Sequence, residues 1–304
     1  MPFRLALLVA GASLAAGAIA QIAPGGVYSQ APKPPFATVE AAARGRTVIS
    51  DGERALATIQ VQNMMSRHEF YHAAGMNLEE VDALWVDRHG GNAATATFAS
   101  PAWVMNGVET VRRAYGEENQ RNREKAIKAI AALDPKVKDD PGFLGAGHEW
   151  VMHPSTTAVI EVAGDGKTAK GVWYSPGLGI MASTDGGRIG AGGHLFWEKY
   201  GGDFIKENGV WKIWHLQMAY DFVPDLPREM TNPTLASYGA KADIAPAAAK
   251  REAGEEMSGA MPPGFTKPAF SYPNYSPSRP GIIYPRLPEP YYTFAETFSY
   301  CNCR

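Results

Sequence analysis

The chain has 304 residues, of which 45% are hydrophobic, and its formal net charge at neutral pH is −2. A chain of this length and apolar content buries a substantial core but shows no second periodic block, so we expect one folded domain with extensions. The small net charge and the absence of a Lys/Arg cluster argue against nucleic acid or an anionic membrane as a partner, and a small apolar ligand fits better.

The N-terminus has the pattern of a secretory signal peptide in residues 1–20. Arg4 supplies a positive charge, an apolar run follows, and Ala18-Ile-Ala20 before Gln21 is a small-residue cleavage site. A membrane anchor is the alternative, but the run is interrupted by glycine and short for a span. We therefore predict a periplasmic or secreted protein that makes no membrane contact after cleavage.

Residues 21–50 are rich in Pro, Gly and Ala and are expected to form a linker or arm. A long helix follows from about Asp51 to Ala74, with Ser50 or Asp51 as its N-cap and Gly75 as its stop.

A second helix is expected from Pro101 or Asn106 to about Tyr115. The charged segment from Glu117 to Leu133 continues or follows it, and residues 117–147 read as an insertion. A lid, a dimer contact and a solvated surface helix are the alternatives for this insertion.

Two antiparallel hairpins follow, each marked by its turn. Their strands and turns are Ala158–Val162, Gly164-Asp-Gly166 and Ala169–Tyr174 for the first, then His194–Tyr200 with Phe204-Ile205, Glu207-Asn-Gly209 and Trp211–Phe222 for the second. Asp-Gly and Asn-Gly supply the positive φ that tight hairpins need. The sequence therefore predicts a twisted, curved antiparallel sheet.

This order of elements resembles the nuclear transport factor 2-like superfamily in its SnoaL-like branch. The phrases Val159-Ile-Glu-Val-Ala-Gly-Asp165 and Asn208-Gly-Val-Trp-Lys-Ile-Trp-His215 are similar to two motifs of that family, and the resemblance covers roughly residues 52–226. It implies an α+β cone-shaped barrel, with the strongly curved sheet wrapped on N-terminal helices, in a domain of residues 51–230. The family includes scytalone dehydratases, ketosteroid isomerases, polyketide cyclases and proteins that only bind, and its members are often dimers, so a homodimer or higher homo-oligomer is an open possibility.

After residue 230 the chain becomes rich in proline and tyrosine, and residues 231–304 cannot continue the sheet. We expect an extended arm packed along the domain or across a subunit boundary. The two cysteines, Cys301 and Cys303, are separated by one residue, where a mutual disulfide is disfavoured. We expect a frayed end there, with pairing between chains as the alternative.

One motif indicates a different chemistry. His68-Glu-Phe-Tyr-His72 is a literal H-E-x-x-H, in which two histidines on one helix face bind zinc and Glu69 acts as general base. The third histidine of the longer protease motif is absent, since position 78 is Leu78, and too little mature chain precedes the motif for a supporting sheet. We therefore expect no metal and keep a zinc-dependent hydrolase as the least favoured alternative.

Four residues are the candidate catalytic groups: Tyr71, His148, His153 and His215. His148 and His153 flank a predicted strand, and the sequence does not decide which is the base. On the last strand, alternation places Trp211, Ile213, His215, Gln217, Ala219 and Asp221 on one face, a pattern that suits a pocket wall. Met64, His68, Trp173, Tyr174, Gln217 and Asp221 are the candidate substrate-binding residues.

A histidine that titrates near neutral pH, with a tyrosine or second histidine to hold an oxyanion, suits eliminations, isomerisations and retro-aldol cleavages. Because no phosphate-binding glycine loop precedes a helix, we expect no cofactor. The sequence therefore favours a cofactor-independent lyase, dehydratase or isomerase acting on a hydrophobic, hydroxylated aromatic or polycyclic molecule. A secreted binding or assembly protein without catalysis is the alternative.

Overall fold

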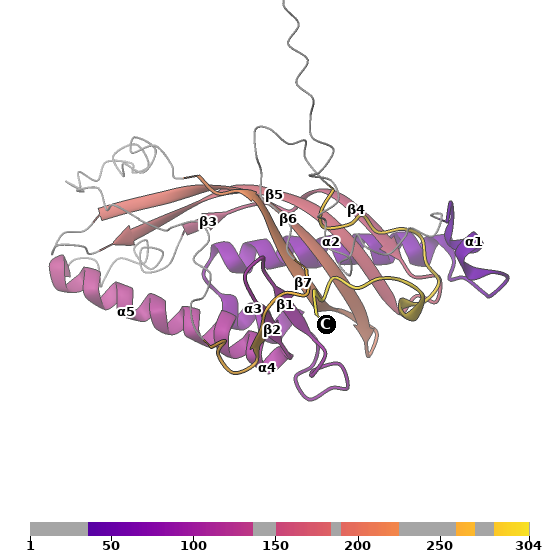
Figure 1. Cartoon of the computed structure of the whole chain (residues 1–304), viewed down its shortest axis with the longest axis horizontal. Coiled ribbons are helices and arrows are strands. Elements are labelled where there is room, and N and C mark those ends of the chain that lie inside the picture. Colours follow the sequence, from indigo (N-terminus) through magenta and orange to yellow (C-terminus); the bar gives the residue numbers. More distant parts are fainter. Residues whose placement is uncertain (1–35, 136–149, 184–189, 225–259, 271–282, 304) are drawn as a thin grey trace, which may run out of the picture.

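The computed structural model describes residues 36–135, 150–183, 190–224, 260–270 and 283–303. Within them the fold is α+β: a sheet of eight strands curves over helix α2 (Asp51–Ala73), as Figure 1 shows. The predicted fold class is confirmed. The predicted signal peptide and the later part of the insertion lie outside the described residues.

The other helices are α1 (Val39–Ala43), α3 (Asn77–Leu84), α4 (Val108–Val111), a π-helix (Arg112–Glu117), α5 (Glu118–Leu133) and a short 3-10 helix (Phe294–Glu296). Helix α2 begins as predicted, because Ser50 and Glu53 form a capping box at 3.2 and 2.9 Å. It ends before Gly75, whose φ is +68°. Of the two predicted starts of the second helix, Pro101 is wrong because residues 104–106 form a strand, whereas Asn106 lies close to the observed start at Val108.

The strands are β1 (Thr97–Ala99), β2 (Val104–Asn106), β3 (Trp150–Met152), β4 (Thr156–Val162), β5 (Thr168–Ser183), β6 (Gly190–Glu207), β7 (Val210–Phe222) and β8 (Phe265–Thr266). Both predicted hairpins are present as the antiparallel pairs β4–β5 and β6–β7. Asn208 and Gly209 both have positive φ, as the tight turn between β6 and β7 requires. Strand β1 pairs with β7 in parallel, which the sequence did not predict.

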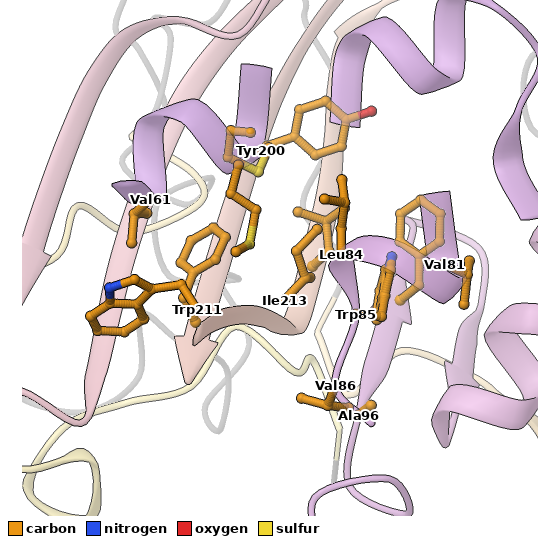
Figure 2. Close-up of a cluster of buried hydrophobic side chains, with 14 of the residues drawn as sticks. Val61, Val81, Leu84, Trp85, Val86, Ala96, Tyr200, Trp211 and Ile213 are labelled. Atoms are coloured by element: carbon orange, nitrogen blue, oxygen red, sulfur yellow. The ribbon is translucent and has the colours of Figure 1, made fainter. Parts of the chain in front are cut away.

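The main hydrophobic core lies between the sheet and helices α2 and α3. Figure 2 shows part of it, with Ile213 of β7 between Val61 of α2 and Trp85 at the end of α3, each no more than 1% exposed. Burial of this apolar surface is the main force that holds α2 inside the curve of the sheet.

The predicted face of β7 is wrong because the strand contains a bulge. Asp203 pairs with His215 and Phe204 pairs with Ile213, so Trp214 is an extra residue. Ile213 packs in the core under α2, whereas His215 lies on the opposite face of the sheet. The alternation of inward and outward side chains therefore reverses at Trp214. The residues predicted to share one face of β7 are divided between the two faces at that point.

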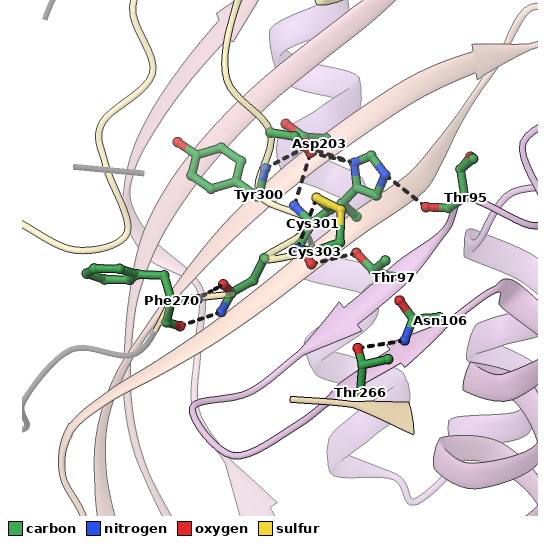
Figure 3. Close-up of a disulfide and its surroundings, with 12 residues drawn as sticks. Thr95, Thr97, Asn106, Asp203, Thr266, Phe270, Tyr300, Cys301 and Cys303 are labelled. Atoms are coloured by element: carbon green, nitrogen blue, oxygen red, sulfur yellow. Dashed lines mark hydrogen bonds and ion pairs between the residues drawn. A yellow bond between two sulfur atoms is a disulfide. The ribbon is translucent and has the colours of Figure 1, made fainter. Parts of the chain in front are cut away.

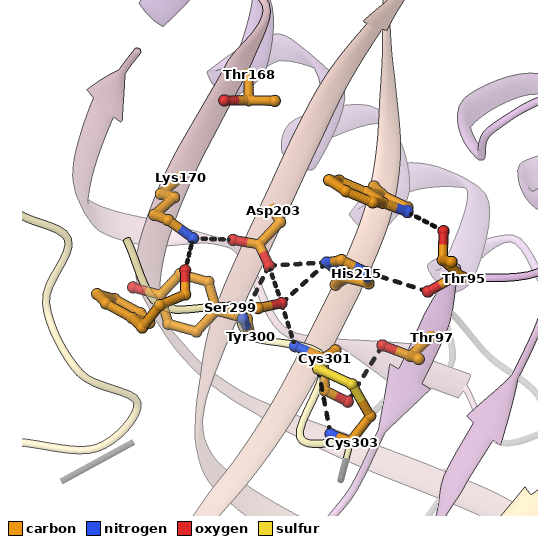
Figure 4. Close-up of polar contacts among 12 residues, drawn as sticks. Thr95, Thr97, Thr168, Lys170, Asp203, His215, Ser299, Tyr300, Cys301 and Cys303 are labelled. Carbon is orange, nitrogen blue, oxygen red and sulfur yellow. Dashed lines mark hydrogen bonds and ion pairs between the residues drawn. A yellow bond between two sulfur atoms is a disulfide. The ribbon is translucent and has the colours of Figure 1, made fainter. Parts of the chain in front are cut away.

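The C-terminal arm covers this outer face around a buried ion pair. Nζ of Lys170 lies 2.6 Å from Asp203, both side chains are fully buried, and Lys170 also donates to the carbonyl of Phe298 (Figure 4). The rings of Tyr291, Phe294, Phe298 and Tyr300 surround the ammonium, their centroids 4.5 to 5.8 Å away. The packed arm is as expected for residues 283–303.

The end of the arm is not frayed, contrary to the sequence-based expectation. Cys301 and Cys303 form a disulfide with each other, shown in Figure 3. Tyr300 is fully buried, and Asn302 exchanges hydrogen bonds of 2.9 Å with the backbone of Phe270. The contacts of Tyr300, just before the first cysteine, and of Asn302, between the two cysteines, order this end of the arm. The spacing of the cysteines alone does not reveal them.

Among the described residues, no helix has the length and apolar character needed to cross a bilayer.

Candidate active site

The candidate active site centres on His153, in the connection between β3 and β4. Its Nδ1 lies 2.9 Å from Oε2 of Glu69 on α2, 3.3 Å from Oε1 of Glu198 on β6, and 3.0 Å from Oγ of Ser175 on β5. Ser175 also donates to the backbone carbonyl of His153, at 3.0 Å. Because these groups engage Nδ1, Nε2 is the nitrogen left for proton exchange with a substrate.

The residues of strands β5 and β6 explain why His153 lies beside Ser175 and Glu198. Ser175 and Glu198 lie opposite each other on paired strands and face the inside of the sheet. Gly177 is the next inward position on β5, and a Cβ there would collide with the backbone of Met152 and with His153. Only glycine lets the chain after β3 cross so close to β5.

A second polar group surrounds Glu80 of α3, which is fully buried. Its Oε1 lies 2.7 Å from Nδ1 of His68, and its Oε2 accepts a 2.8 Å hydrogen bond from Tyr115. Nδ1 of His72 lies 2.8 Å from the hydroxyl of Tyr115 and 2.9 Å from the side-chain amide of Asn77. The carboxylate therefore joins two histidines of α2 in one network.

The two polar groups meet in space. The ring of His72 lies with centroid distances of 4.9 Å from His153 and 6.0 Å from His68. The ring of Tyr200 contacts His68 and His153. It lies edge-on to His68 and is stacked on His153, with centroid distances of 5.4 and 6.1 Å. Nε2 of His68 is buried and has no hydrogen-bond partner among the described residues, an unusual state for a polar atom in a protein interior.

Charge and burial act in opposite directions on these histidines. Burial lowers the pKa of His68, but the charge and hydrogen bond of Glu80 outweigh it and raise that pKa to about 9. Burial also lowers the pKa of His153, yet the carboxylates of Glu69 and Glu198 beside it raise that pKa above its ordinary value. The pKa of Glu69 stays low despite its burial, because His153 and His68 stabilise the carboxylate.

These groups do not make the zinc site that H-E-x-x-H predicts. Glu69, the base of that motif, is committed to His153, and it accepts a hydrogen bond from Ser155 as well. No group of three or more His, Cys, Asp or Glu side chains within the described parts of the chain is arranged to hold a metal ion. The motif is better explained as a helix that presents His68, Glu69 and His72 to a buried polar site.

Of the candidate catalytic residues that the structure describes, only His153 belongs to this cluster. His148 lies outside the described residues. Tyr71 packs against the edge of the core and lines a separate groove between α2 and the β6–β7 turn, which Met64 also lines.

The fourth candidate, His215, lies on the opposite face of the sheet beneath the C-terminal arm. Its Nδ1 contacts Asp203 at 2.8 Å and Ser299 at 3.2 Å, and its Nε2 faces the carbonyl of Thr95 at 3.0 Å. A serine triad needs the serine and the carboxylate at opposite nitrogens of the imidazole. Both lie at Nδ1 here, so this group reads as an anchor for the arm.

The candidate substrate-binding residues divide between the two faces. His68 and Trp173 face inward, and the indole of Trp173 donates to Gln62 of α2 at 2.8 Å. Tyr174, Gln217 and Asp221 lie on the outer face, where Gln217 donates to Tyr284 and Asp221 pairs with Lys199 at 2.9 Å.

Comparison with known families agrees with this architecture. The family model of the SnoaL-like domain matches residues 53–217, more than half of the chain. This chain belongs to the SnoaL-like domain family. The matched range holds α2, α3 and the inner faces of the long strands, so the SnoaL-like domain contains every residue of the polar cluster described above.

Several solved structures resemble the SnoaL-like domain. A hexachlorocyclohexane dehydrochlorinase of Novosphingobium barchaimii LL02 is 14% identical, with a TM-score of 0.37, over 58% of this chain and 94% of its own. A protein of the NTF2-like family from Streptomyces avermitilis is 18% identical, with a TM-score of 0.37, over 55% of this chain and 97% of its own. A likeness of this degree says nothing of activity. No curated protein matches the chain.

Sequence reasoning missed Glu80, Tyr115, Ser175 and Glu198, and considered Glu69 only as part of a zinc motif. One signal was available for Glu80: with Asn77, Val81 and Leu84 it forms the buried face of α3 at helical spacing. A carboxylate at such a position needs a partner, and His68 fills that role.

Proposed function

We propose that the SnoaL-like domain of this protein is a cofactor-independent lyase, dehydratase or isomerase in which His153 is the general base. The observation that carries the proposal is the buried ion pair between His153 and Glu69, with Glu198 beside it. Ser175 is the hydrogen-bond partner of Nδ1, and the charges of the two carboxylates beside it stabilise the imidazolium that forms when Nε2 takes a proton.

His68 supplies the complementary acid. Its pairing with Glu80 keeps the imidazole protonated at neutral pH, and within the described part of the chain its buried Nε2 has no hydrogen-bond partner. In an elimination, His153 takes a proton from carbon, the electron pair forms the new double bond, and the leaving hydroxyl departs as water with the proton of His68. In an isomerisation, the same N–H of His68 stabilises the oxyanion that forms after proton abstraction.

Aromatic side chains around the base favour a hydrophobic ring-containing substrate. The centroid of the Phe196 ring lies 6.4 Å from that of the His153 imidazole, and the ring of Tyr200 stacks on the same imidazole. The substrate class we propose is a hydroxylated aromatic or polycyclic molecule, because such a ring packs against these faces while its hydroxyl reaches the histidines.

Incubation with a panel of hydroxylated aromatic and polycyclic compounds, with a chelator present, tests the proposal. Mass spectrometry is expected to show loss of water or formaldehyde, or an isomer of unchanged mass. His153→Gln should abolish the conversion, and His89→Gln, in an exposed turn, should not. Tight binding without conversion would replace the proposal by a binding protein, and conversion that needs added zinc would replace it by a metal enzyme.

We also propose that the mature protein begins at Gln21 and acts in the periplasm or outside the cell. The Cys301–Cys303 disulfide supports this, since disulfides persist in oxidising compartments. N-terminal sequencing of protein from the periplasm or medium should read from Gln21. Recovery of chain beginning at Met1 in the cytoplasm would contradict export.

A further inference from the structure

The disulfide between Cys301 and Cys303 is badly placed for a structural staple. It closes a loop across a single residue, Asn302, so it connects the C-terminal arm only to itself and not to the sheet. The stability that a crosslink gives falls with the length of the loop that it closes, so a loop this short gains little. The position of this disulfide therefore calls for a chemical explanation.

The backbone around the disulfide is held by other contacts. The carbonyl of Cys301 accepts a 3.2 Å hydrogen bond from Oγ1 of Thr97 on β1, and its N–H donates to Oγ of Ser299 at 3.0 Å. Asn302 has a φ of +46°, in the left-handed region that asparagine tolerates better than most residues. Its side chain is hydrogen-bonded to the backbone of Phe270, as Figure 3 shows. These contacts hold the turn at Asn302 independently of the covalent bond.

The two sulfur atoms differ in their surroundings. Cys303 is exposed, whereas Cys301 is only partly exposed and follows Tyr300, which is fully buried. Sγ of Cys301 accepts a 3.2 Å hydrogen bond from the backbone N–H of Cys303. A thiolate attacks the more accessible sulfur of a disulfide, and the sulfur whose negative charge is better stabilised leaves faster. Both differences favour attack at Cys303 and departure of Cys301.

We propose that the Cys301–Cys303 pair is a thiol–disulfide exchange site for small thiols, with Cys303 as the sulfur that is attacked. The thiol gives its proton to water, its sulfur bonds to Sγ of Cys303, the bond between the two cysteines breaks, and the electron pair leaves on Sγ of Cys301. A second thiolate then attacks the sulfur of the bound thiol, which releases a small disulfide and leaves both cysteines reduced. Two thiols are oxidised and one protein disulfide is reduced, so the electrons balance.

The first step is readily reversed, because the turn keeps Cys301 beside the mixed disulfide. The thiolate of Cys301 attacks Sγ of Cys303, restores the bond and expels the small thiol. A nucleophile held this close reacts at a high effective concentration. Ser299, next to the site, contacts His215 on the outer face of the sheet, whereas His153 lies on the inner face. Exchange is therefore independent of the proposed catalysis, and His153→Gln should exchange as wild type does.

Mass spectrometry after rapid alkylation tests the direction of attack. The oxidised full chain is mixed with excess glutathione and quenched with N-ethylmaleimide, and tandem mass spectrometry of the tryptic peptide that follows Arg286 locates both groups. Glutathione should be found on Cys303 and N-ethylmaleimide on Cys301. An oxidised peptide of residues 299–303 is the matched control, since without the contacts to the rest of the fold its two sulfurs should be attacked more evenly. The reverse placement, the same distribution in protein and peptide, or no adduct in the protein would overturn the proposal.

Asn302→Val tests the role of the turn. Valine disfavours positive φ and cannot bond to the backbone of Phe270, so Cys301 should close on the mixed disulfide at least about 10-fold more slowly. Closure is followed as loss of the glutathione adduct after dilution. Asn63→Val, at an exposed position of α2, should close at the wild-type rate. Trypsin cleavage at Arg286, measured in parallel, distinguishes slow closure from a detached arm. An unchanged closure rate in Asn302→Val would contradict a site organised by this turn.

Discussion

Oε2 of Glu69 lies 2.9 Å from Nδ1 of His153, although one residue belongs to helix α2 and the other to the connection between β3 and β4. The contact spans the interior between helix and sheet, and Glu69 is largely buried, its side chain 11% exposed. An ion pair placed there is costly to desolvate, so it needs its full set of partners. This arrangement organises the candidate active site.

The pKa of His153 should depend on its two carboxylate neighbours, Glu69 and Glu198. We predict a midpoint above 6.5 in imidazole NMR spectra, because Glu69 and Glu198 favour the charged ring more than burial disfavours it. In Glu69→Gln the midpoint should fall, since the negative charge 2.9 Å from Nδ1 is gone. A midpoint that is the same in both proteins would show that the carboxylate does not set the charge of His153.

The pair of His68 and Glu80 should make stability depend on pH. The pKa of His68 is about 9 in the folded protein and near 6.5 when unfolded, so its contribution is fully present below pH 6.5 and lost as pH rises toward 9. The loss is on the order of 3 kcal/mol of unfolding free energy. Urea unfolding across this pH range should show the decline in wild type and a much weaker one in Glu80→Gln.

A matched control for that experiment is Glu109→Gln, which removes the exposed partner of Arg88. Its pH dependence should follow wild type, because exposed ion pairs contribute little. A decline of equal size in Glu80→Gln and wild type would assign the effect to other groups.

The C-terminal arm should depend on Lys170. Lys170→Met removes the cation from a fully buried pair and leaves Asp203 without its main counter-charge. A loss of about 3–5 kcal/mol is expected for breaking such a pair, and limited trypsin digestion should cut faster at Arg286. Lys206→Met, on an exposed side chain, is the control. An unchanged digestion pattern would mean that the arm is held elsewhere.

Position 177 should affect the site through geometry alone. The methyl group of Gly177→Ala has no room beside Met152 and His153, so the imidazole should move away from Glu69 and Glu198. Displacement of about 1 Å lowers turnover by on the order of 100-fold. The imidazole shifts of His153 should change with it. Gly91→Ala, where a Cβ meets no atom within 4 Å, should leave both unchanged.

Local signals predicted much of the fold. The capping box at Ser50, the stop at Gly75 and the Asn208-Gly209 turn each act within a few residues, so the sequence shows them directly. The parallel pairing of β1 with β7 depends on distant contacts made by a three-residue strand, which carries almost no periodic pattern.

The candidate site was predictable only in part, for the same reason. A single extra residue, Trp214, reverses the faces of β7 and moves His215 away from His153. The sequence of β7 does not reveal the bulge. With or without an extra residue at Trp214, the strand has a plausible mixture of polar and apolar side chains on each face. Likewise, Glu80 and Glu198 become functional candidates only when folding brings them to histidines far away in the chain.

The pH profile of turnover, compared between wild type and Glu69→Gln, tests the central claim most directly. With a substrate found in the panel, the account predicts that kcat/KM of wild type rises with pH through a midpoint above 6.5, as neutral His153 forms. In Glu69→Gln the midpoint should shift to lower pH and the plateau should fall. A wild-type rate that does not rise with pH, or an identical profile in the variant, would contradict His153 and Glu69 as the proton-abstracting pair.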